Sequence, residues 1–465
     1  MHKLTRPLFR SNNLYSLPKK LENVLIFEKL TSFNYYRKQG SLNRHNFGNY
    51  DRMVQANIDH EQCVDQVRSI LKNYQIRDKN IRKITTRQEG FELLGGTVIR
   101  GNNSNGSGAT DDILNQRKTD IKLSNSIKNR TKQNENKNQS SKNNQRTQWI
   151  PDIIISIGGD GTFLRASHLL HKDLNTNNIP ILGINSNPNL SEGRLCAGTG
   201  QNLSVSDILH DTFTNSSIPV VKRQRIKIEM KSRTESDFYM KDFHHDKIPL
   251  EPPKSVVERV RAINDPEAFF QSTLPVMALN DVYIGERAAS MVSNIDVSYK
   301  RPPHSYRDAT QPWVPHHSQK NSGLIISTGT GSTGWSRSAN HICPETMKTV
   351  VEFLRQEMKV PYKYQEALNT LDYDKLSTEM NSIRTIFDPE DKYLGVTFKD
   401  PIDNKISTGN KANFIKVTCL RARSKLKYGM VSIDGTTYHD FSRGSIIECV
   451  SHPDYAINCI DVSDY

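Results

Sequence analysis

The fold is decided by the stretch Ile153-Ile154-Ile155-Ser156-Ile157-Gly158-Gly159-Asp160-Gly161-Thr162, in which an apolar run leads directly into a glycine turn with one acid. The β-branched residues predict a strand that is covered on both faces, as in a parallel sheet. Apolar residues at helical spacing over 163–171 predict a helix after the turn. Because glycine leaves the backbone bare, N–H groups and the helix dipole would form an anion site there.

Asp160 is the acid in this turn. A carboxylate beside a bound phosphate is unfavourable unless it holds a metal ion or accepts a proton, so its presence indicates catalysis rather than phosphate binding. Gly158, Gly159, Gly161 and Thr162 would then contact the phosphates of a nucleotide. The alternative is an ordinary strand-turn-helix connection in which Asp160 caps the helix.

The length and the cysteines restrict the class of protein. With 465 residues, the chain is too long for a single core, which predicts two domains with additional segments. No apolar run is long enough to span a bilayer, so we expect no membrane partner. The six cysteines are scattered without a C-x-x-C pair, which is typical of reduced thiols in a non-secreted protein and disfavours a disulfide framework or a zinc site.

The formal net charge of +13 is concentrated in two segments. Residues 1–21 carry five Lys or Arg and no acid, and residues 101–149 carry nine Lys or Arg against four acids. The remaining chain has a net charge of only +3, so we expect no nucleic-acid partner. The 101–149 segment, rich in Asn, Ser, Lys and Gln, is interpreted as a disordered insertion. Residues 1–21 resemble a transit peptide, which predicts a mitochondrial location; a disordered basic tail on a cytoplasmic protein is the alternative.

Strands and helices alternate over residues 22–215. The segments that carry this pattern are strands at 23–27, 81–85, 153–157 and 179–185 and a helix at 63–71. Their order predicts a doubly wound α/β domain with a mostly parallel sheet. In such a domain, ligands bind beyond the carboxyl ends of the strands.

From Val220 onward the periodicity becomes that of strands joined by short turns, which predicts an antiparallel all-β domain over 216–449. The strand-like segments are 225–230, 276–284, 293–299, 415–420 and 430–433. Between them, we interpret three stretches as irregular insertions, the last of them partly helical: 231–270, 301–320 and 344–404.

Two further motifs lie in this second half. Asn280-Asp281 stands at the head of an apolar strand, where the amide could bond to a base edge and the carboxylate could accept hydrogen bonds from two ribose hydroxyls. An Asx turn that opens the strand is the alternative. The second motif contains only Gly, Ser and Thr from Ser327 to Gly334 and ends at Trp335, whose ring could pack on a base. Its alternative is a low-complexity linker.

In this order and with these separations, the glycine turn, Asn280-Asp281 and the loop from Ser327 to Trp335 resemble the NAD kinase family. The resemblance covers most of 22–465 apart from the insertions. Further segments are similar to the branch of the family found in animal mitochondria, namely 182–185 with 191–196, the loop end at 334–336, and 431–435.

The resemblance implies ATP-dependent transfer of a phosphoryl group to the 2′-hydroxyl of the adenosine ribose of NAD, giving NADP. Mg²⁺ would arrive with the ATP rather than occupy a metal site of the protein, and the family's members are homo-oligomers. The implied fold is an α/β domain followed by a β-sandwich, with the chain end at 450–465 returning to the first domain. Carried over to this chain, the roles are Asp160 as catalytic acid-base residue, Gly159, Gly161 and Thr162 for nucleotide phosphates, and Asn280, Asp281, Thr333, Gly334 and Trp335 for NAD, with Arg194, Ser327 and Thr328 as further candidates.

Some positions depart from the family pattern. Ser322 stands where many members have Asp, and Trp335 stands where they have Tyr. Two alternative functions share part of the pattern: a lipid kinase of the diacylglycerol or sphingosine type, which has the glycine turn, and a non-catalytic nucleotide-binding protein on the same fold. For Glu192 and Arg194, a surface salt bridge is the alternative to a role in the site.

Overall fold

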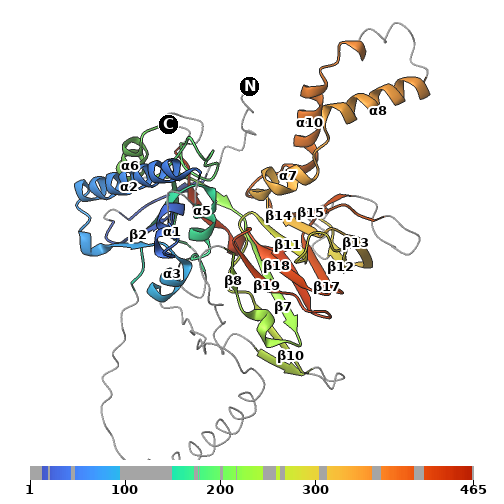
Figure 1. Cartoon of the computed structure of the whole chain (residues 1–465), viewed down its shortest axis with the longest axis horizontal. Helices are drawn as coiled ribbons and strands as arrows, with labels where there is room; N and C mark the ends of the chain where they lie inside the picture. Colours follow the sequence, from blue (N-terminus) through green and yellow to red (C-terminus); the bar gives the residue numbers. More distant parts are fainter. Residues whose placement is uncertain are drawn as a thin grey trace, which may run out of the picture. The chain divides into compact units, whose positions relative to one another are not determined.

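The computed structural model describes residues 13–18, 21–42, 48–94, 149–171, 176, 178–198, 203–215, 217–243, 258–261, 268–302, 312–358, 368–402 and 413–462. The insertion predicted at 101–149 lies outside these residues except for Trp149, and of the basic segment 1–21 only 13–18 and Leu21 are described. The described strands form three seven-stranded sheets (Figure 1).

The first sheet has the strand order β1-β6-β21-β5-β4-β2-β3. In this sheet, β3, β2, β4, β5 and β21 pair in parallel. At one edge, β6 pairs antiparallel with β21, and β1 pairs antiparallel with β6. The strands are β1 (Leu14–Tyr15), β2 (Val24–Glu28), β3 (Ile81–Ile84), β4 (Ile153–Gly158), β5 (Ile181–Asn185), β6 (Ile218–Arg223) and β21 (Ile457–Ile460). The helices between them are α1 (Ser32–Lys38), α2 (Tyr50–Asn73), α3 (Arg87–Leu93), α5 (Asp160–Ser167) and α6 (Val205–Thr214).

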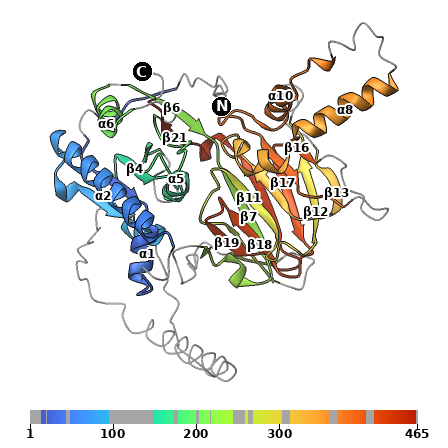
Figure 2. The ribbon, with the colours of Figure 1, turned by 45° about the horizontal axis from the view of Figure 1, so that its top comes forward.

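Helices cover both faces of this sheet, because its central strands are apolar on both sides. On one face, alternate residues of β2 and β4 share a core with α2 and α6. On the other face lies α5, since a Cβ added to Gly183 of β5 would come within 2.8 Å of the Phe163 ring on α5. Figure 2 shows α2 and α5 on either side of β4. This two-sided covering is the doubly wound arrangement that the sequence predicts.

The second and third sheets have the orders β13-β12-β17-β20-β7-β10-β9 and β16-β15-β14-β11-β18-β19-β8. All their pairs of described strands are antiparallel. Both sheets contribute to one hydrophobic core, with Ile226 and Ile228 from β7 and Val282 and Ile284 from β11. The predicted fold class, an α/β part followed by an antiparallel β-sandwich, is confirmed. The strands are β7 (Ile226–Ser232), β8 (Lys241–Asp242), β9 (Glu258–Arg261), β10 (Ala268–Thr273), β11 (Asp281–Glu286), β12 (Ser293–Lys300), β13 (Val314–Asn321), β14 (Leu324–Ser327), β15 (Leu394–Phe398), β16 (Phe414–Val417), β17 (Cys419–Ser424), β18 (Gly429–Ile433), β19 (Thr437–Asp440) and β20 (Ile446–Ser451).

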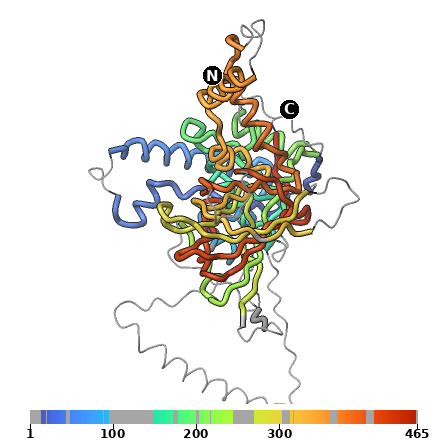
Figure 3. Tube along the Cα trace, turned by 90° about the vertical axis from the view of Figure 1, so that its right-hand side faces the viewer, coloured from blue at the N-terminus to red at the C-terminus, as the bar shows by residue number. Residues whose placement is uncertain are grey.

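The three stretches interpreted as insertions contain strands of these sheets, and the interpretation is wrong at those positions. The stretch 231–270 contains β8, β9 and part of β10, and the stretch 301–320 contains most of β13. The stretch 344–404 contains β15 together with α8 (Pro344–Glu357) and α10 (Tyr373–Thr385). β9 and β13 are edge strands, which pair on one side only and need no regular apolar alternation. Figure 3 shows α8 and α10 standing away from the sheets. In addition, β6 pairs in the first sheet although it lies beyond residue 215.

Two findings concern the class of protein. Within the described parts of the chain, no helix combines the length and the apolar character that a membrane crossing requires. All six cysteines are free, and five of them are buried. Burial raises the pKa of Cys63 and Cys459 to about 11, so these thiols stay protonated at neutral pH.

Candidate functional site

The glycine turn lies between β4 and α5, at the carboxyl end of the parallel strands. β4 ends at Gly158, Gly159 caps the helix and α5 begins at Asp160. A Cβ on Gly158 would lie 2.3 Å from the hydroxyl oxygen of Thr162, so glycine is required there. At Gly161 an added Cβ would meet no atom within 4 Å, which leaves this backbone open to a ligand. The Thr162 N–H already donates to the Gly159 carbonyl at 3.0 Å.

Asp160 does not cap its helix, because Gly159 occupies the N-cap position. Its carboxylate instead binds the loop after β5. Oδ1 accepts the N–H of Leu195 at 2.8 Å, and Oδ2 accepts the N–H of Arg194 at 3.2 Å. Since each carboxylate oxygen has a second lone-pair direction, both can still accept from a substrate hydroxyl. The alternative of a capping aspartate is therefore wrong.

The side chain of Arg194 pairs with Glu192 in an exposed salt bridge. Such pairs contribute little to stability. The surface-pair alternative from the sequence is thereby confirmed, and the contact of Arg194 with Asp160 is made by its backbone.

A cavity of about 440 Å³ opens at the turn. Its wall is formed by residues 159–162, by 27–30 at the end of β2, by 185–187 at the end of β5 and by 434–436 after β18. The cavity therefore lies at the sheet edge where doubly wound domains bind ligands, and the turn between β18 and β19 of the β-sandwich adds to its wall. Its volume suits a small molecule.

Lys29 and Arg165 bring positive charge to this wall. Lys29 is exposed directly after β2, and Arg165 on α5 contacts Asp242 at 3.2 Å. Cationic side chains of this kind bind phosphate. The sequence analysis missed both residues, although a Lys directly after the first parallel strand was a usable signal. In the described ranges, no cluster of three or more potential metal-ligating side chains is found.

The structure brings Asn280-Asp281 and the Gly-Ser-Thr loop together. Asp281 of β11 pairs with Ser327 of β14. Thr328 donates through its hydroxyl to the Leu279 carbonyl at 2.6 Å and through its N–H to the Asn280 carbonyl at 2.9 Å. The Ser327 hydroxyl donates to the Gly395 carbonyl at 3.3 Å. Ser327 and Thr328 are fully buried, so their hydroxyls hold the loop together and do not face a ligand.

Asn280 and Asp281 have polar atoms that are not hydrogen-bonded to any of the described residues. Oδ1 of Asn280 is buried without a hydrogen-bond partner among the described residues, so it does not form the Asx turn considered from the sequence. Burial and the neighbouring Asp434 carboxylate raise the pKa of Asp281 to about 7. Both side chains therefore have acceptor capacity that a nucleoside could fill.

The end of the loop lies at the surface. Thr333 is half-buried, and Gly334 and Trp335 are exposed. The Trp335 ring lies 5.2 Å from the Tyr283 ring with an interplanar angle of 32°. These three residues do not line the 440 Å³ cavity, and neither do Asn280 and Asp281.

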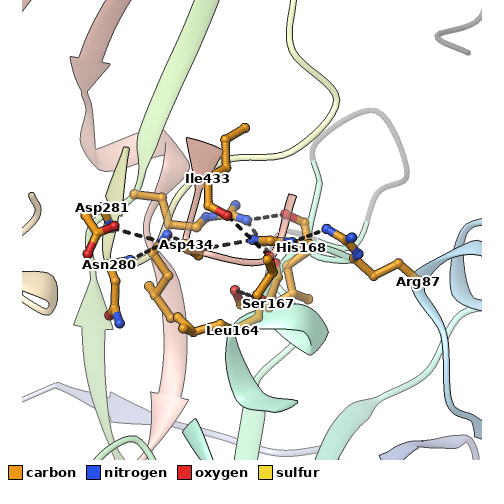
Figure 4. A network of polar contacts seen from close by, with 12 residues as sticks. Arg87, Leu164, Ser167, His168, Asn280, Asp281, Ile433 and Asp434 are labelled. Carbon is orange, nitrogen blue, oxygen red and sulfur yellow. Dashed lines mark hydrogen bonds and ion pairs between the residues drawn. The ribbon is translucent and has the colours of Figure 1, made fainter. Parts of the chain in front are cut away.

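The link between the cavity and Asn280-Asp281 is Asp434, a residue of the cavity wall that the sequence did not assign to the site. Its carboxylate accepts the N–H of Asn280 at 2.8 Å and the N–H of Asp281 at 3.1 Å (Figure 4). One buried carboxylate thus belongs to the cavity wall and also holds the backbone of Asn280-Asp281.

Comparison with known proteins matches residues 78–189 to the family model described as the ATP-NAD kinase N-terminal domain. This range includes β3, β4, the glycine turn, α5 and β5. Over 335 residues, the chain is 27% identical to NAD kinase 2, mitochondrial, of Xenopus tropicalis, covering 69% of this chain and 73% of that protein. The chain is thus similar to NAD kinases over about two thirds of its length. The NAD kinase 2, mitochondrial, of Homo sapiens is 28% identical over 304 residues, which is 65% of this chain and 63% of the human protein.

A crystal structure of yeast NADH kinase complexed with NADH aligns with a TM-score of 0.43 and 12% identity, over 97% of this chain and 89% of that one. The aligned region of the human relative is slightly less than two thirds of its length. The matched range 78–189 includes the glycine turn and residues 185–187 of the cavity wall.

Proposed function

We propose that this chain transfers the terminal phosphoryl group of ATP to the 2′-hydroxyl of the adenosine ribose of NAD, giving NADP. The observation that carries the proposal is the position of Asp160, a half-buried carboxylate fixed by two backbone N–H groups at the wall of the cavity. Positioning and charge neutralisation supply most of the catalysis in phosphoryl transfer. A fixed carboxylate with nearby cations offers both.

In this proposal, Asp160 accepts the hydrogen bond of the attacking hydroxyl and takes its proton as the new bond to phosphorus forms and the bond between that phosphorus and the leaving ADP breaks. The open backbone at Gly161 and the cations Lys29 and Arg165 hold the phosphates. Mg²⁺ would enter as part of the Mg-ATP substrate and would neutralise charge on its phosphates.

On the NAD side, the free Oδ1 of Asn280 accepts from a nucleoside donor, and Asp281 accepts from ribose hydroxyls. Thr333 and Gly334 lie beside the dinucleotide, and the exposed Trp335 ring packs on a base. The roles of all five residues come from the family resemblance. Those of Asn280 and Asp281 are also supported by their unused polar atoms.

The test is product formation by the purified full-length protein. We expect NADP when Mg-ATP and NAD are supplied, with no product from sphingosine or diacylglycerol. Asp160→Asn should lower kcat by at least about 1,000-fold while nucleotide affinity changes by less than about threefold, because the amide cannot take a proton. Asp65→Asn, an exposed carboxylate on α2, is the matched control. Unchanged turnover in Asp160→Asn would contradict the assigned role.

We also propose a mitochondrial location and a homo-oligomeric state. The basic, acid-free segment 1–21 supports the location. Imaging of residues 1–21 fused to a reporter tests it, and diffuse cytosolic signal would contradict it. Light scattering of the purified protein tests the assembly, and a monomeric mass would exclude it.

A further inference from the structure

His168 directly follows α5 and is buried between two charged side chains (Figure 4). Its Nδ1 lies 3.0 Å from a guanidinium nitrogen of Arg87, and its Nε2 lies 3.0 Å from Oδ2 of Asp434. Because a guanidinium can only donate, Nδ1 must accept, and the ring is neutral with its proton on Nε2. Burial lowers the pKa of His168, which agrees with a neutral ring. His168 is therefore a donor to Asp434.

Asp434 receives four donors. Besides His168, its carboxylate accepts the N–H groups of Leu279 at 2.9 Å, Asn280 at 2.8 Å and Asp281 at 3.1 Å. Three consecutive amides therefore converge on one carboxylate, the arrangement of a backbone anion nest. With four donors, the lone pairs of the carboxylate are filled. The backbone of Leu279–Asp281 is held by this one side chain, which His168 in turn orients.

We propose that His168 is a positioning residue that fixes the NAD-side segment Leu279–Asp281 relative to Asp160 through Asp434. Helix α5 begins with Asp160 and its C-cap is His168, so one short rigid element has the catalytic carboxylate at its start and this contact at its end. The His168–Asp434 bond then sets the separation between the phosphate turn and the NAD-side segment. Only the kinetic consequence of this proposal depends on the proposed function.

Hydrogen exchange tests the positioning without any assay of activity. The variants of the full-length protein are His168→Leu, which removes the donor, and His168→Gln, whose amide nitrogen takes the place of Nε2. We expect the amides of 279–281 to exchange about tenfold faster in His168→Leu, because a charge-assisted bond to their acceptor is lost, and at close to the wild-type rate in His168→Gln. Equal exchange in the wild type and His168→Leu would overturn the proposal.

Two further variants complete this test. His168→Asn places its nitrogen near Nδ1, out of reach of Asp434, and serves as a second donor-free variant should His168→Leu fail to fold; it should exchange like His168→Leu. His439→Leu replaces another fully buried histidine, on β19, and should leave exchange at 279–281 unchanged. Faster exchange in His439→Leu would mean that any buried histidine has this effect, and would overturn the proposal.

Steady-state kinetics then separates positioning from general damage. We expect His168→Leu to raise the KM for NAD about tenfold with the KM for ATP within about twofold, and His168→Gln to restore it. A fall in kcat with both KM values unchanged would contradict the positioning role. A wild-type protein that makes no NADP would refute the proposed function, while the exchange result would still decide the role of His168.

Discussion

Replacing Asp281 with Asn removes a carboxylate whose ionisation opposes folding. Its pKa is raised from 3.8 to about 7 by burial and by Asp434. The unfolded chain loses this proton near pH 3.8, whereas the folded protein keeps it until about pH 7. The stability contributed by the protonated group is therefore fully present below pH 3.8 and is lost as the pH rises through about 7. At about 1.4 kcal/mol per pH unit, the loss is on the order of 4 kcal/mol.

We expect Asp281→Asn to become more stable relative to the wild type as the pH rises from about 4 to about 8, by up to ~4 kcal/mol. Urea denaturation of both proteins across this range, followed by tryptophan fluorescence, measures the difference. Titration of groups that do not interact with Asp281 cancels in the comparison. A stability difference between the two proteins that stays constant with pH would refute the reasoning.

Glu286→Gln, at the other end of β11, is the matched control. The Glu286 carboxylate is also buried, but it accepts the N–H groups of Lys427 at 2.6 Å and Tyr428 at 2.7 Å. An amide offers one oxygen where the carboxylate offers two, so this variant should lose about 1–3 kcal/mol at neutral pH. The two substitutions remove the same charge and should change stability in opposite directions, because of the two carboxylates only that of Glu286 has hydrogen-bond partners among the described residues.

Three further results are expected. Gly158→Ala should unfold at lower denaturant concentration than the wild type, because its Cβ would lie 2.3 Å from the Thr162 hydroxyl. Gly161→Ala should keep its stability within ~1 kcal/mol, because its Cβ would meet no protein atom within 4 Å, but should lose activity because the Cβ would crowd the ligand. Arg194→Ala should keep kcat within about threefold, since the Asp160 contact is made by its backbone; a loss above about 100-fold would contradict this. Ribose donors favour the ionised carboxylate, so NAD binding near pH 6.5 should release a proton from Asp281. Calorimetry in buffers of different ionisation enthalpy should detect this proton release in the wild type and not in Asp281→Asn.

The sequence predicts those parts of the fold that local signals determine. The strand at 153–158 and the turn after it depend on neighbouring residues, namely a β-branched run and glycines that the backbone requires. β13 and β15 could not be found in this way. β13 is polar and lies at a sheet edge, and β15 lies in a segment dominated by helices. Their strand conformation depends on partners distant in sequence, which periodicity does not detect.

The candidate site shows the same limit. Asp160 was predicted because a carboxylate beside a bound phosphate is unfavourable unless it holds a metal ion or accepts a proton, but its partners are backbone N–H groups that no side-chain pattern reveals. Ser327 and Thr328 have the residue types of a ligand loop, yet their hydroxyls bond to carbonyl groups of neighbouring strands. Asp434 lies in the segment 431–435, which was found similar to the family but was given no role. Its contacts with 279–281 arise when β18 pairs with β11.

Asp160 and Asp281 have opposite surroundings, and the difference bears on how the site works. Asp160 is half-buried, and its carboxylate already accepts hydrogen bonds from two backbone N–H groups. Asp281 is buried beside another carboxylate, and no hydrogen bond to its side chain is found among the described residues, so its ionised form destabilises the fold. Such an arrangement persists where a ligand supplies the missing interactions. Ribose hydroxyls are suitable donors, and their binding would make ionisation of Asp281 favourable. Part of the affinity for NAD would then come from removing the unfavourable free energy of ionised Asp281 that is already present in the folded chain.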